Sequence, residues 1–501
     1  MSVWNMLLNP ARRRASAIRL ATHTDGRAEV PESSPAWGKP VPLTLPWPDQ
    51  QGSGEVRTEI ERDYDRILYA APVRRMADKT QVFPLERNDV VRTRLTHSHE
   101  VANLARAAGV DLVFNHAVAQ TRHQAARDVP TLLGTLGLAH DLGNPPFGHQ
   151  GERAMQAWFE RCAPEVFAER HGLTEAMRLD FLRFEGNAQT LRLLTKLQII
   201  NDDYGLNLTY ATLAALLKYP VASNQVDKNQ PVRRKHGFFQ SEARMVEEVW
   251  GATGLSAGQR HPLTFVLEAC DDIAYCVLDA EDAVKKRLVS FHDILAFLRH
   301  AAGQDATLAW VCNEAEREHV VYREAGLSPA ELNDISMQVF RIRAMGVLMR
   351  ALTEAWLRQQ QAILDGVFVG ELLESSSAGV FISALRQFNQ RHVYRHPSVL
   401  KVELRGFEVI HELMDMLWFA ITDREPGAPA EAPRRSPFAS YAYGRMSENY
   451  RRVFESPSNP MPIRYREAQL LTDMIAGMTD SYAVAMCEEL RPHYRAVAAR
   501  A

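Results

Sequence analysis

The stretch that decides the fold reads HDLGNPPFGHQGE, from His140 to Glu152. It follows an apolar run, residues 131–142, whose pattern predicts a helix that the next glycine and the two prolines cannot continue. Neighbouring residues on a helix point about 100° apart, but at a helix end both His140 and Asp141 can reach one ion. Taken alone, this dipeptide is better explained as a hydrogen-bonded pair in a core, so its interpretation depends on the rest of the sequence.

Two flanking runs change that interpretation. RLTH, residues 94–97, supplies His97, and DDIAY, residues 271–275, supplies Asp271. Together with the central His-Asp pair they make two imidazoles and two carboxylates, a typical ligand set for one divalent metal such as Mn, Fe, Ni, Co or Zn. Such a set leaves coordination positions open for water and substrate, an arrangement that performs hydrolysis.

The second flanking run lies on a predicted helix from Pro262 to Val289, the longest unbroken helical pattern that we find. Asp271, Tyr275 and Asp279 fall on one face of it by the i, i+4 rule. A buried carboxylate needs a partner or a metal, so this stripe favours a functional role. Asp272 points about 100° away and is expected to form an ion pair, although the sequence leaves open which aspartate is the ligand.

A histidine and an acid follow the central pair. His149 and Glu152 are three residues apart at the start of the next predicted helix and share a face. Glu152 can bond one ring nitrogen and leave the other to transfer a proton, as general acid–base catalysis requires. The turn at 144–148 is expected to present His149 without making it a metal ligand.

Helical periodicity dominates from Glu59 onward, which predicts an all-α fold. We divide the chain into an N-terminal segment and arm (1–58), a catalytic core (59–290) and a helical C-terminal region (291–501). Further helices are predicted at 186–200, 210–218, 330–365 and 466–490, and a small β element at 399–409.

Composition limits the remaining choices. The 501 residues carry a net charge of -3, which gives no global indication of nucleic-acid binding. Five scattered cysteines are typical of reduced thiols. Because no apolar stretch approaches the ~18 residues that span a bilayer, we expect a cytoplasmic protein with no membrane partner. Residues 23–58 and 425–437 are too long for ordinary connections, so they are either disordered or packed on a neighbouring subunit.

A series of sequence blocks resembles the HD-domain deoxynucleotide triphosphohydrolases, and within them the long bacterial deoxyguanosine triphosphate triphosphohydrolases (dGTPases). The blocks are 79–88, 92–97, 140–152, 184–189, 217–219, 269–285, 396–397 and 477–480. This resemblance implies an HD core with long helical C-terminal additions. It also assigns His97, His140, Asp141 and Asp271 as metal ligands, and it favours His97 over His99.

The resemblance further implies a substrate site. Arg94 would contact the α-phosphate, and the other phosphates would meet Lys218, Tyr219, Lys235 and Asn187. Tyr275 would exclude a ribose 2′-hydroxyl. Gln81 and Asp279 would hold the 3′-hydroxyl, and Val82 and Glu403 would touch the guanine. Arg445 or Arg451 would add a further contact.

The implied reaction is metal-dependent hydrolysis of dGTP to deoxyguanosine and tripolyphosphate, by attack of a metal-bound hydroxide on the α-phosphorus. His149, oriented by Glu152, would protonate the leaving oxygen. The metal would be Mn or Mg, with Fe, Co, Ni and Zn as alternatives. Two other functions stay open: a broader deoxynucleotide triphosphohydrolase or other HD-type nucleotide phosphohydrolase, and a nucleic-acid-binding or regulatory module with a vestigial site.

The resemblance also implies assembly. Long bacterial members of this family form homohexamers and bind single-stranded DNA as an activator. We therefore expect a homohexamer in which basic residues such as Arg234 and Lys235 lie beside a DNA groove. Binding there should depend strongly on salt.

Overall fold

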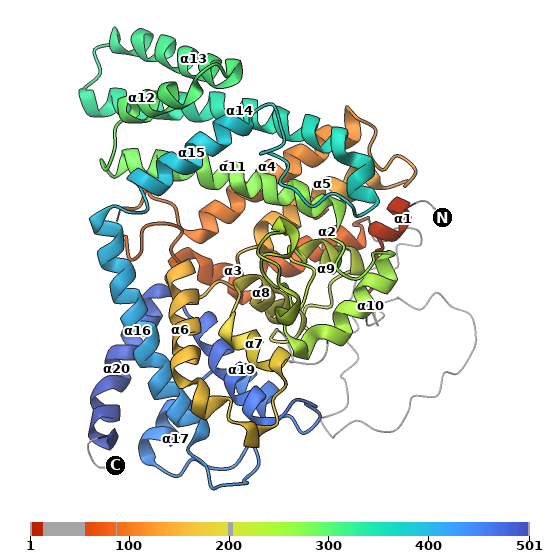
Figure 1. Ribbon diagram of the computed structural model, residues 1–501, viewed down its shortest axis with the longest axis vertical. Coiled ribbons are helices and arrows are strands. Elements are labelled where there is room, and N and C mark those ends of the chain that lie inside the picture. The colour runs from red at the N-terminus through yellow and green to blue at the C-terminus, as the bar shows by residue number, and fades with distance from the viewer. Residues whose placement is uncertain (1–2, 14–55, 87, 199–203, 499–501) are drawn as a thin grey trace, which may run out of the picture.

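The computed structural model describes residues 3–13, 56–86, 88–198 and 204–498. The all-α prediction is confirmed, because these residues form helices joined by loops, with no strand among them (Figure 1). Extended pairing within the described part is limited to two isolated bridges, Arg12 with Thr209 and Thr80 with Thr93. No helix in these ranges is long and apolar enough to cross a bilayer. The five cysteines are all free thiols.

The helices of the N-terminal half are α1 (Val3–Leu7), α2 (Glu59–Leu68), α3 (Ala71–Arg75), η1 (Met76–Asp78), α4 (Arg94–Phe114), α5 (Ala125–Ala139), α6 (Gly148–Val166), η2 (Glu169–His171), α7 (Glu175–Leu182), α8 (Gly186–Thr195), α9 (Tyr210–Leu216), η3 (Ser223–Gln225), η4 (Pro231–Arg233), η5 (Gln240–Glu242) and α10 (Ala243–Thr253).

The helices of the C-terminal half are α11 (Pro262–Lys285), α12 (Phe291–Ala302), α13 (Ala306–Arg323), α14 (Pro329–Leu364), α15 (Gly379–His392), α16 (Pro397–Thr422), α17 (Pro437–Gly444), α18 (Glu448–Glu455), α19 (Ile463–Ala476) and α20 (Asp480–Ala498).

Three sequence-based expectations about these helices were wrong. The longest is α14, with 36 residues, rather than α11. The stretch 466–490 is two helices that meet at Gly477, and the predicted β element at 399–409 is helical. In α16 the buried residues recur at helical spacing, and His396 caps a first turn that contains Pro397. The local content of β-branched and charged residues therefore did not decide the structure there.

The core that carries the site consists of α4, α5 and α11. Helices α4 and α5 lie side by side, and a Cβ at Gly137 would come within 2.4 Å of the Cα of Ala102, so only glycine permits this approach. Thr93 caps α4 with its side chain, and the helix therefore starts at Arg94. Helix α11 packs against α4, α14 and α15, and it lies below α14 in the view of Figure 1.

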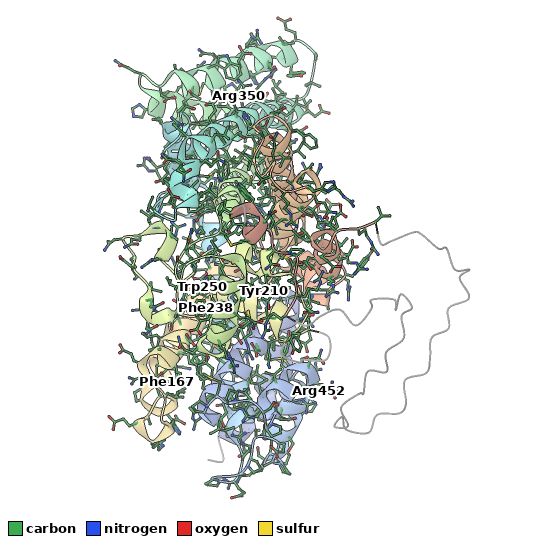
Figure 2. All side chains as sticks on the ribbon, turned by 90° about the vertical axis from the view of Figure 1, so that its right-hand side faces the viewer. Phe167, Tyr210, Phe238, Trp250, Arg350 and Arg452 are labelled. Atoms are coloured by element: carbon green, nitrogen blue, oxygen red, sulfur yellow. The ribbon has the colours of Figure 1, made fainter. Side chains whose placement is uncertain are left out.

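The two ends of the molecule are built from different parts of the chain. Helices α12–α14 form one end, and α17 with the C-terminal part of α20 lies at the other (Figure 1). Figure 2 shows Arg350 of α14 near the first end and Arg452 of α18 toward the second. Helix α16 packs along α6, α19 and α20 in the part of the molecule that leads to the second end. The site lies between these ends, where α16 and α11 approach the turn before α6.

The long connections behave differently from expectation where they can be seen. The 425–437 loop packs on its own chain: Arg434 donates from Nε to the carbonyl of Ala420 at 2.9 Å and lies 3.6 Å from the centre of the Tyr443 ring. The length of the loop therefore did not predict its position, because the buried side chain of Arg434 holds the loop against its own chain. Of the 23–58 segment, residues 23–55 lie outside the described residues.

Aromatic residues of the C-terminal region belong mostly to an ordinary core. Trp356 is fully buried, donates to the carbonyl of Pro262 at 3.2 Å and packs near Trp4 of α1. Removing such a side chain typically costs about 3–5 kcal/mol. Phe381 and Trp418 are also buried, whereas Tyr441 is half exposed. These residues therefore stabilise the single chain and give no support for a subunit interface.

Candidate active site

A cavity of about 680 Å³ opens where α4, α6, α11, α15 and α16 converge. Apart from the alternatives Arg445 and Arg451, every residue that the sequence assigned to the site lines the cavity, except His97, Glu152 and Asp279. Those three are buried directly behind the wall, with at most 5% of their surface exposed. The structure therefore brings predicted residues from six of the quoted sequence blocks, together with Lys235 and Glu403, to one place.

A cluster of metal-ligand type lies at the inner end. Ligand atoms of His97, His140 and Asp271 all lie within 4.8 Å of one another, and no other such group of three occurs in the described part of the chain. Asp271 Oδ1 is 3.2 Å from His97 Nε2 and 3.4 Å from His140 Nε2. His140 Nδ1 lies 2.7 Å from the carbonyl of Gly137 (the partner that an N–H there would have), which leaves Nε2 facing the cluster.

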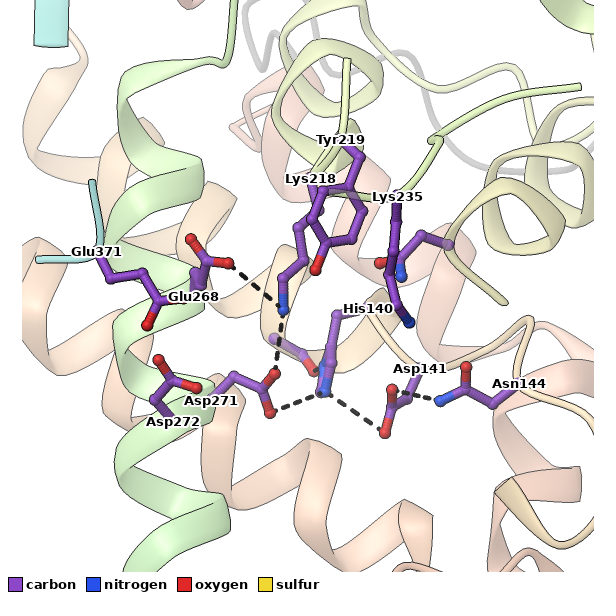
Figure 3. Close-up of polar contacts among 12 residues, drawn as sticks. His140, Asp141, Asn144, Lys218, Tyr219, Lys235, Glu268, Asp271, Asp272 and Glu371 are labelled. Carbon is purple, nitrogen blue, oxygen red and sulfur yellow. Dashed lines mark hydrogen bonds and ion pairs between the residues drawn. The ribbon is translucent and has the colours of Figure 1, made fainter. Parts of the chain in front are cut away.

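The fourth predicted ligand has competing partners. Asp141 Oδ2 lies 3.5 Å from His140 Nε2, but it is also paired with Arg94, and Asn144 donates to Oδ1 at 2.6 Å (Figure 3). Asp141 is therefore adjacent to the cluster without being one of its three members. Asp272 pairs with Arg386 at 2.7 Å, outside the cluster.

His99 is exposed on α4. It is not part of the cluster. The geometry favours His97 and Asp271 over their sequence neighbours.

The electrostatics of the cluster fit a bound cation. Burial opposes the charged ring, yet Asp141 and Asp271 raise the pKa of His140 to about 9. Despite burial, His140 and His97 hold the pKa of Asp271 well below its usual range. His140 Nε2, which faces the cluster, is buried and has no hydrogen-bond partner. Two imidazoles and a carboxylate focused on one point suit a divalent ion that accepts both nitrogen and oxygen ligands.

His149 and Glu152 make the contact that their spacing predicted. His149 Nδ1 lies 2.9 Å from Glu152 Oε2, and the ring is largely exposed to the cavity. The amide N–H of Gly186 donates to Glu152 Oε1 at 2.9 Å, so the carboxylate is fixed on both sides. Although burial opposes the charged form, Lys235 and His149 lower the pKa of Glu152 to about 2. The carboxylate therefore stays ionised and orients the ring.

Cationic and neutral donors surround the middle of the cavity (Figure 3). Lys218 Nζ lies 3.5 Å from Asp271 Oδ2 and 3.9 Å from Glu268 Oε1. Lys235 Nζ lies 2.8 Å from Glu185 Oε2, and Asn187 donates to the same carboxylate at 2.8 Å. Each of these donors already has an acidic partner, so an anionic ligand would exchange one partner for another.

Tyr394, which we did not predict from the sequence, contacts both Tyr275 and Asp279, the two residues predicted to face the sugar. The ring of Tyr394 stacks on that of Tyr275, with centroids 5.5 Å apart, and its hydroxyl donates to Asp279 Oδ2 at 2.7 Å. Asp279 is 1% exposed, and burial raises its pKa well above its usual range. Gln81 lines the cavity with a buried carbonyl oxygen that has no partner. The quoted block at 396–397 begins two residues after Tyr394 and was the available signal.

The outer end contains Glu403 and several residues that we did not anticipate. Gln150 donates to Glu403 Oε2 at 3.1 Å, and burial raises the pKa of Glu403. Arg153 and Arg395 line the same end. Gln150 and Arg153 follow His149 in sequence, so their position could have been inferred from the helix start, whereas Arg395 could not.

Two predicted basic contacts are placed differently. Arg445 pairs with Glu489 at 2.8 Å and Arg451 lies over the Tyr443 ring, so neither lines the cavity of its own chain. Arg234 lines the cavity beside Lys235 and pairs with Glu371 at 2.8 Å. Arg234 and Lys235 thus belong to the cavity wall in this chain.

Comparison with known proteins agrees with this geometry. The HD domain family matches residues 94–179, which contain His97, the His140–Glu152 run and the pair at 149 and 152. A deoxyguanosinetriphosphate triphosphohydrolase-like protein of Listeria monocytogenes is 34% identical, over 97% of this chain and 99% of its own. The chain belongs to this HD-domain family.

Two further deoxyguanosinetriphosphate triphosphohydrolase-like proteins are similar over a smaller share of this chain. The protein of Synechocystis sp. is 33% identical over 87% of this chain and 94% of its own, and that of Pseudomonas aeruginosa is 31% identical over 87% and 93%. The likeness thus reaches far beyond the HD match into α15 and α16, which supply the outer end of the cavity. The predicted family is confirmed, and the domain boundaries at 58 and 290 stay a prediction.

Proposed function

We propose that this protein is a metal-dependent deoxynucleotide triphosphohydrolase that converts dGTP and water to deoxyguanosine and tripolyphosphate. One observation carries the proposal: the metal-type cluster and the His149–Glu152 pair open onto one cavity that also holds Lys218 and Lys235. The names of the relatives support the same substrate. A nucleic-acid-binding module would need neither the cluster nor the oriented histidine.

A divalent metal would be held by His97, His140 and Asp271, with Asp141 as the further ligand. When bound, such an ion activates water and neutralises charge on a phosphate. The mixed imidazole and carboxylate set fits Mn, and Mg, Fe, Co, Ni or Zn are the ions to compare with it. For Asp141 to act as a ligand, its carboxylate would have to give up part of its pairing with Arg94.

His149 would serve as the general acid. The water oxygen forms a bond to the α-phosphorus, and the bond from phosphorus to the 5′-oxygen breaks. Protonated His149 gives its Nε2 proton to that 5′-oxygen and regains a proton from the attacking water. Glu152 keeps Nε2 directed into the cavity because it accepts from Nδ1, while Gly186 holds Glu152 in place.

The cations would receive the triphosphate. Lys218 and Lys235 are paired with Glu268 and Glu185, and phosphate oxygens would replace these carboxylates as partners. Hydrogen bonds between charged groups are roughly twice as strong as neutral ones. Arg94, paired with Asp141, would face the α-phosphate, where charge develops in the transition state.

The sugar and base would extend toward α15 and α16. Tyr275, held by its stacking on Tyr394, would fill the space of a ribose 2′-hydroxyl, and Gln81 with Asp279 would hold the 3′-hydroxyl. Glu403, steadied by Gln150, would accept from the N1–H and 2-amino groups of guanine, a donor pair that the other bases lack. Val82 would contact the base from the opposite segment.

The test is to incubate the protein with each divalent metal and each of the four deoxynucleotides and to resolve all products. We expect tripolyphosphate and deoxyguanosine from dGTP, with the other nucleotides slower. Equal rates with all four nucleotides would contradict guanine selectivity and indicate a broader deoxynucleotide triphosphohydrolase. Release of pyrophosphate or single phosphates would contradict the proposed reaction.

Assembly is a separate part of the proposal. Leu400 and Leu404 of α16 are 46% and 61% exposed beside the mouth of the cavity, which supports contact with other subunits there. We expect light scattering to give a homohexamer of the 56.5 kDa chain, activated by single-stranded DNA. A monomer whose activity ignores DNA would contradict both expectations and leave the chemistry unaffected.

A further inference from the structure

The block Gly477–Asp480, where α19 ends and α20 begins, has no role in the chemistry described above. It nevertheless touches both walls of the cavity. We propose that Asp480 is a positioning residue that holds the turn before His149 in register with the segment that carries Gln81 and Val82. This inference rests on the proposed function for its kinetic consequences, but the geometry that it describes can be tested without activity.

Asp480 binds the two walls with different oxygens. Oδ1 accepts from the amide N–H of Phe147 at 3.0 Å, and Oδ2 accepts from the amide N–H of Thr80 at 3.0 Å and from the Thr80 hydroxyl. The carboxylate is 1% exposed and belongs to neither wall. A buried carboxylate whose acceptors are all used by donors from two remote segments acts as a bridge between them.

A second contact from the same junction doubles the attachment. Lys79 Nζ donates to the carbonyl of Asn144 at 2.6 Å and to the carbonyl of Ala476 at 2.7 Å. Lys79 is buried and directly precedes Thr80. The 144–147 turn is therefore held at its first residue by Lys79 and at its last by Asp480.

The turn needs such support because its backbone is strained. Phe147 has φ 61°, in the left-handed region, and Gly148 follows with φ 56°. A residue with a Cβ is disfavoured there, because its Cβ approaches the following carbonyl oxygen. Helix α6 begins at Gly148, so relaxation of Phe147 would rotate the first turn of α6 and move His149 with it.

Phe147 also connects the turn to the outer end of the cavity. A Cβ at Gly406 of α16 would lie 2.5 Å from Cγ of the Phe147 ring, so ring and helix are in direct contact. Glu403 lies one turn earlier on α16. On the other wall, Thr80 pairs with Thr93 at the start of α4, the helix that carries His97. Asp480 thus lies at the centre of the contacts that fix the distance between the inner and outer ends of the cavity.

The kinetic test is a double-mutant cycle with Asp480→Asn and His149→Ala. Asparagine keeps the shape of the aspartate side chain, but its NH₂ group replaces one of the two oxygens and would face a donor that this oxygen now accepts from. We expect D480N alone to lower kcat about 10–100-fold and to leave the metal content unchanged. In the H149A background the same substitution should have almost no further effect on kcat, because Asp480 acts through the position of the His149 ring. Equal losses in both backgrounds would overturn the proposal.

Two further variants separate the branches. Thr80→Val removes only the hydroxyl bond to Asp480 and should raise KM for dGTP while kcat changes little. Ser481→Ala is the matched control, because this neighbouring side chain bonds only Asp78 at the surface and should leave both parameters unchanged. A T80V enzyme with wild-type KM would overturn the assignment of the second wall.

The geometric test is independent of catalysis. Hydrogen exchange followed by mass spectrometry should show faster exchange in D480N at residues 79–83 and 144–152, with α13 unchanged. Unchanged exchange in both segments would overturn the positioning role. If the wild-type enzyme fails to hydrolyse dGTP, the exchange result still decides this inference, so the two failures are distinguishable.

Discussion

The inner and outer ends of the cavity are built on different principles. At the inner end, His97, His140 and Asp271 are fixed by helices α4, α5 and α11 and by contacts with one another. At the outer end, Arg395 and Leu400 are exposed side chains beside α15 and on α16, far along the chain. From this difference we expect the buried network at the inner end to determine turnover, and the side chains at the outer end to determine the choice of substrate. Changes at the inner end should abolish turnover, and changes at the outer end should alter ratios between substrates.

The largest effect is expected from Asp271→Ala. In the proposed reaction the metal would activate the attacking water. Loss of this carboxylate should therefore reduce metal binding and lower activity by roughly 10³-fold or more. Metal content by mass spectrometry and turnover with dGTP give the two measurements. The matched variant is Asp272→Asn, which removes an adjacent carboxylate paired with Arg386 and should keep the metal. A stoichiometric metal and full activity in D271A would show that the ligand assignment is wrong.

The next largest effect is expected from His149→Ala. Turnover should fall by roughly 10²–10⁴-fold, the usual contribution of a general acid–base, while metal content and melting temperature stay close to wild type. His99→Ala serves as the control, since that ring is exposed on α4 away from the cavity. A mutant that loses its metal together with its activity would instead make His149 a ligand.

A smaller effect, on selectivity, is expected from Tyr275→Ala. Removing the ring that Tyr394 stacks against should reduce the preference for dGTP over GTP by about 10–100-fold, because the space for the 2′-hydroxyl opens. The quantity to compare is kcat/KM for the two nucleotides in each enzyme. An unchanged ratio would remove Tyr275 as the sugar discriminator.

The smallest effect is expected from Glu403→Gln at the outer end. The amide oxygen can still accept the hydrogen bond from Gln150, but the negative charge and the second acceptor oxygen are lost. The preference for dGTP over dATP should therefore fall about tenfold. Turnover at saturating dGTP should change little, in contrast to both inner-end variants. If E403Q instead lowers kcat as strongly as H149A, the distinction between the two ends does not hold.

The inner end was predictable from the sequence because its residues have rare chemistry at fixed helical spacings. Asp271, Tyr275 and Asp279 share a face of α11, and the three-residue interval from His149 to Glu152 is one helical turn. Such spacings survive folding, because the helix sets the direction of the side chains. The family resemblance then separated these residues from ordinary core pairs.

The outer end and the supporting contacts could not be predicted in the same way. Tyr394, Arg395 and Asp480 reach the cavity region because distant helices pack there. The quoted blocks at 396–397 and 477–480 adjoin or contain these residues, but they gave no indication of the contacts that the side chains make. The erroneous β element at 399–409 has the same origin, since burial in α16 is set by tertiary contacts rather than by β propensity. The 425–437 loop likewise owes its position to one buried arginine.

The most direct test of the central claim is hydrolysis of dGTP in ¹⁸O-labelled water. The account has water attack the α-phosphorus while His149 protonates the departing 5′-oxygen. It therefore predicts one ¹⁸O atom in the released tripolyphosphate and none in deoxyguanosine. Label in the 5′-hydroxyl of deoxyguanosine, or release of dGMP with pyrophosphate, would contradict it.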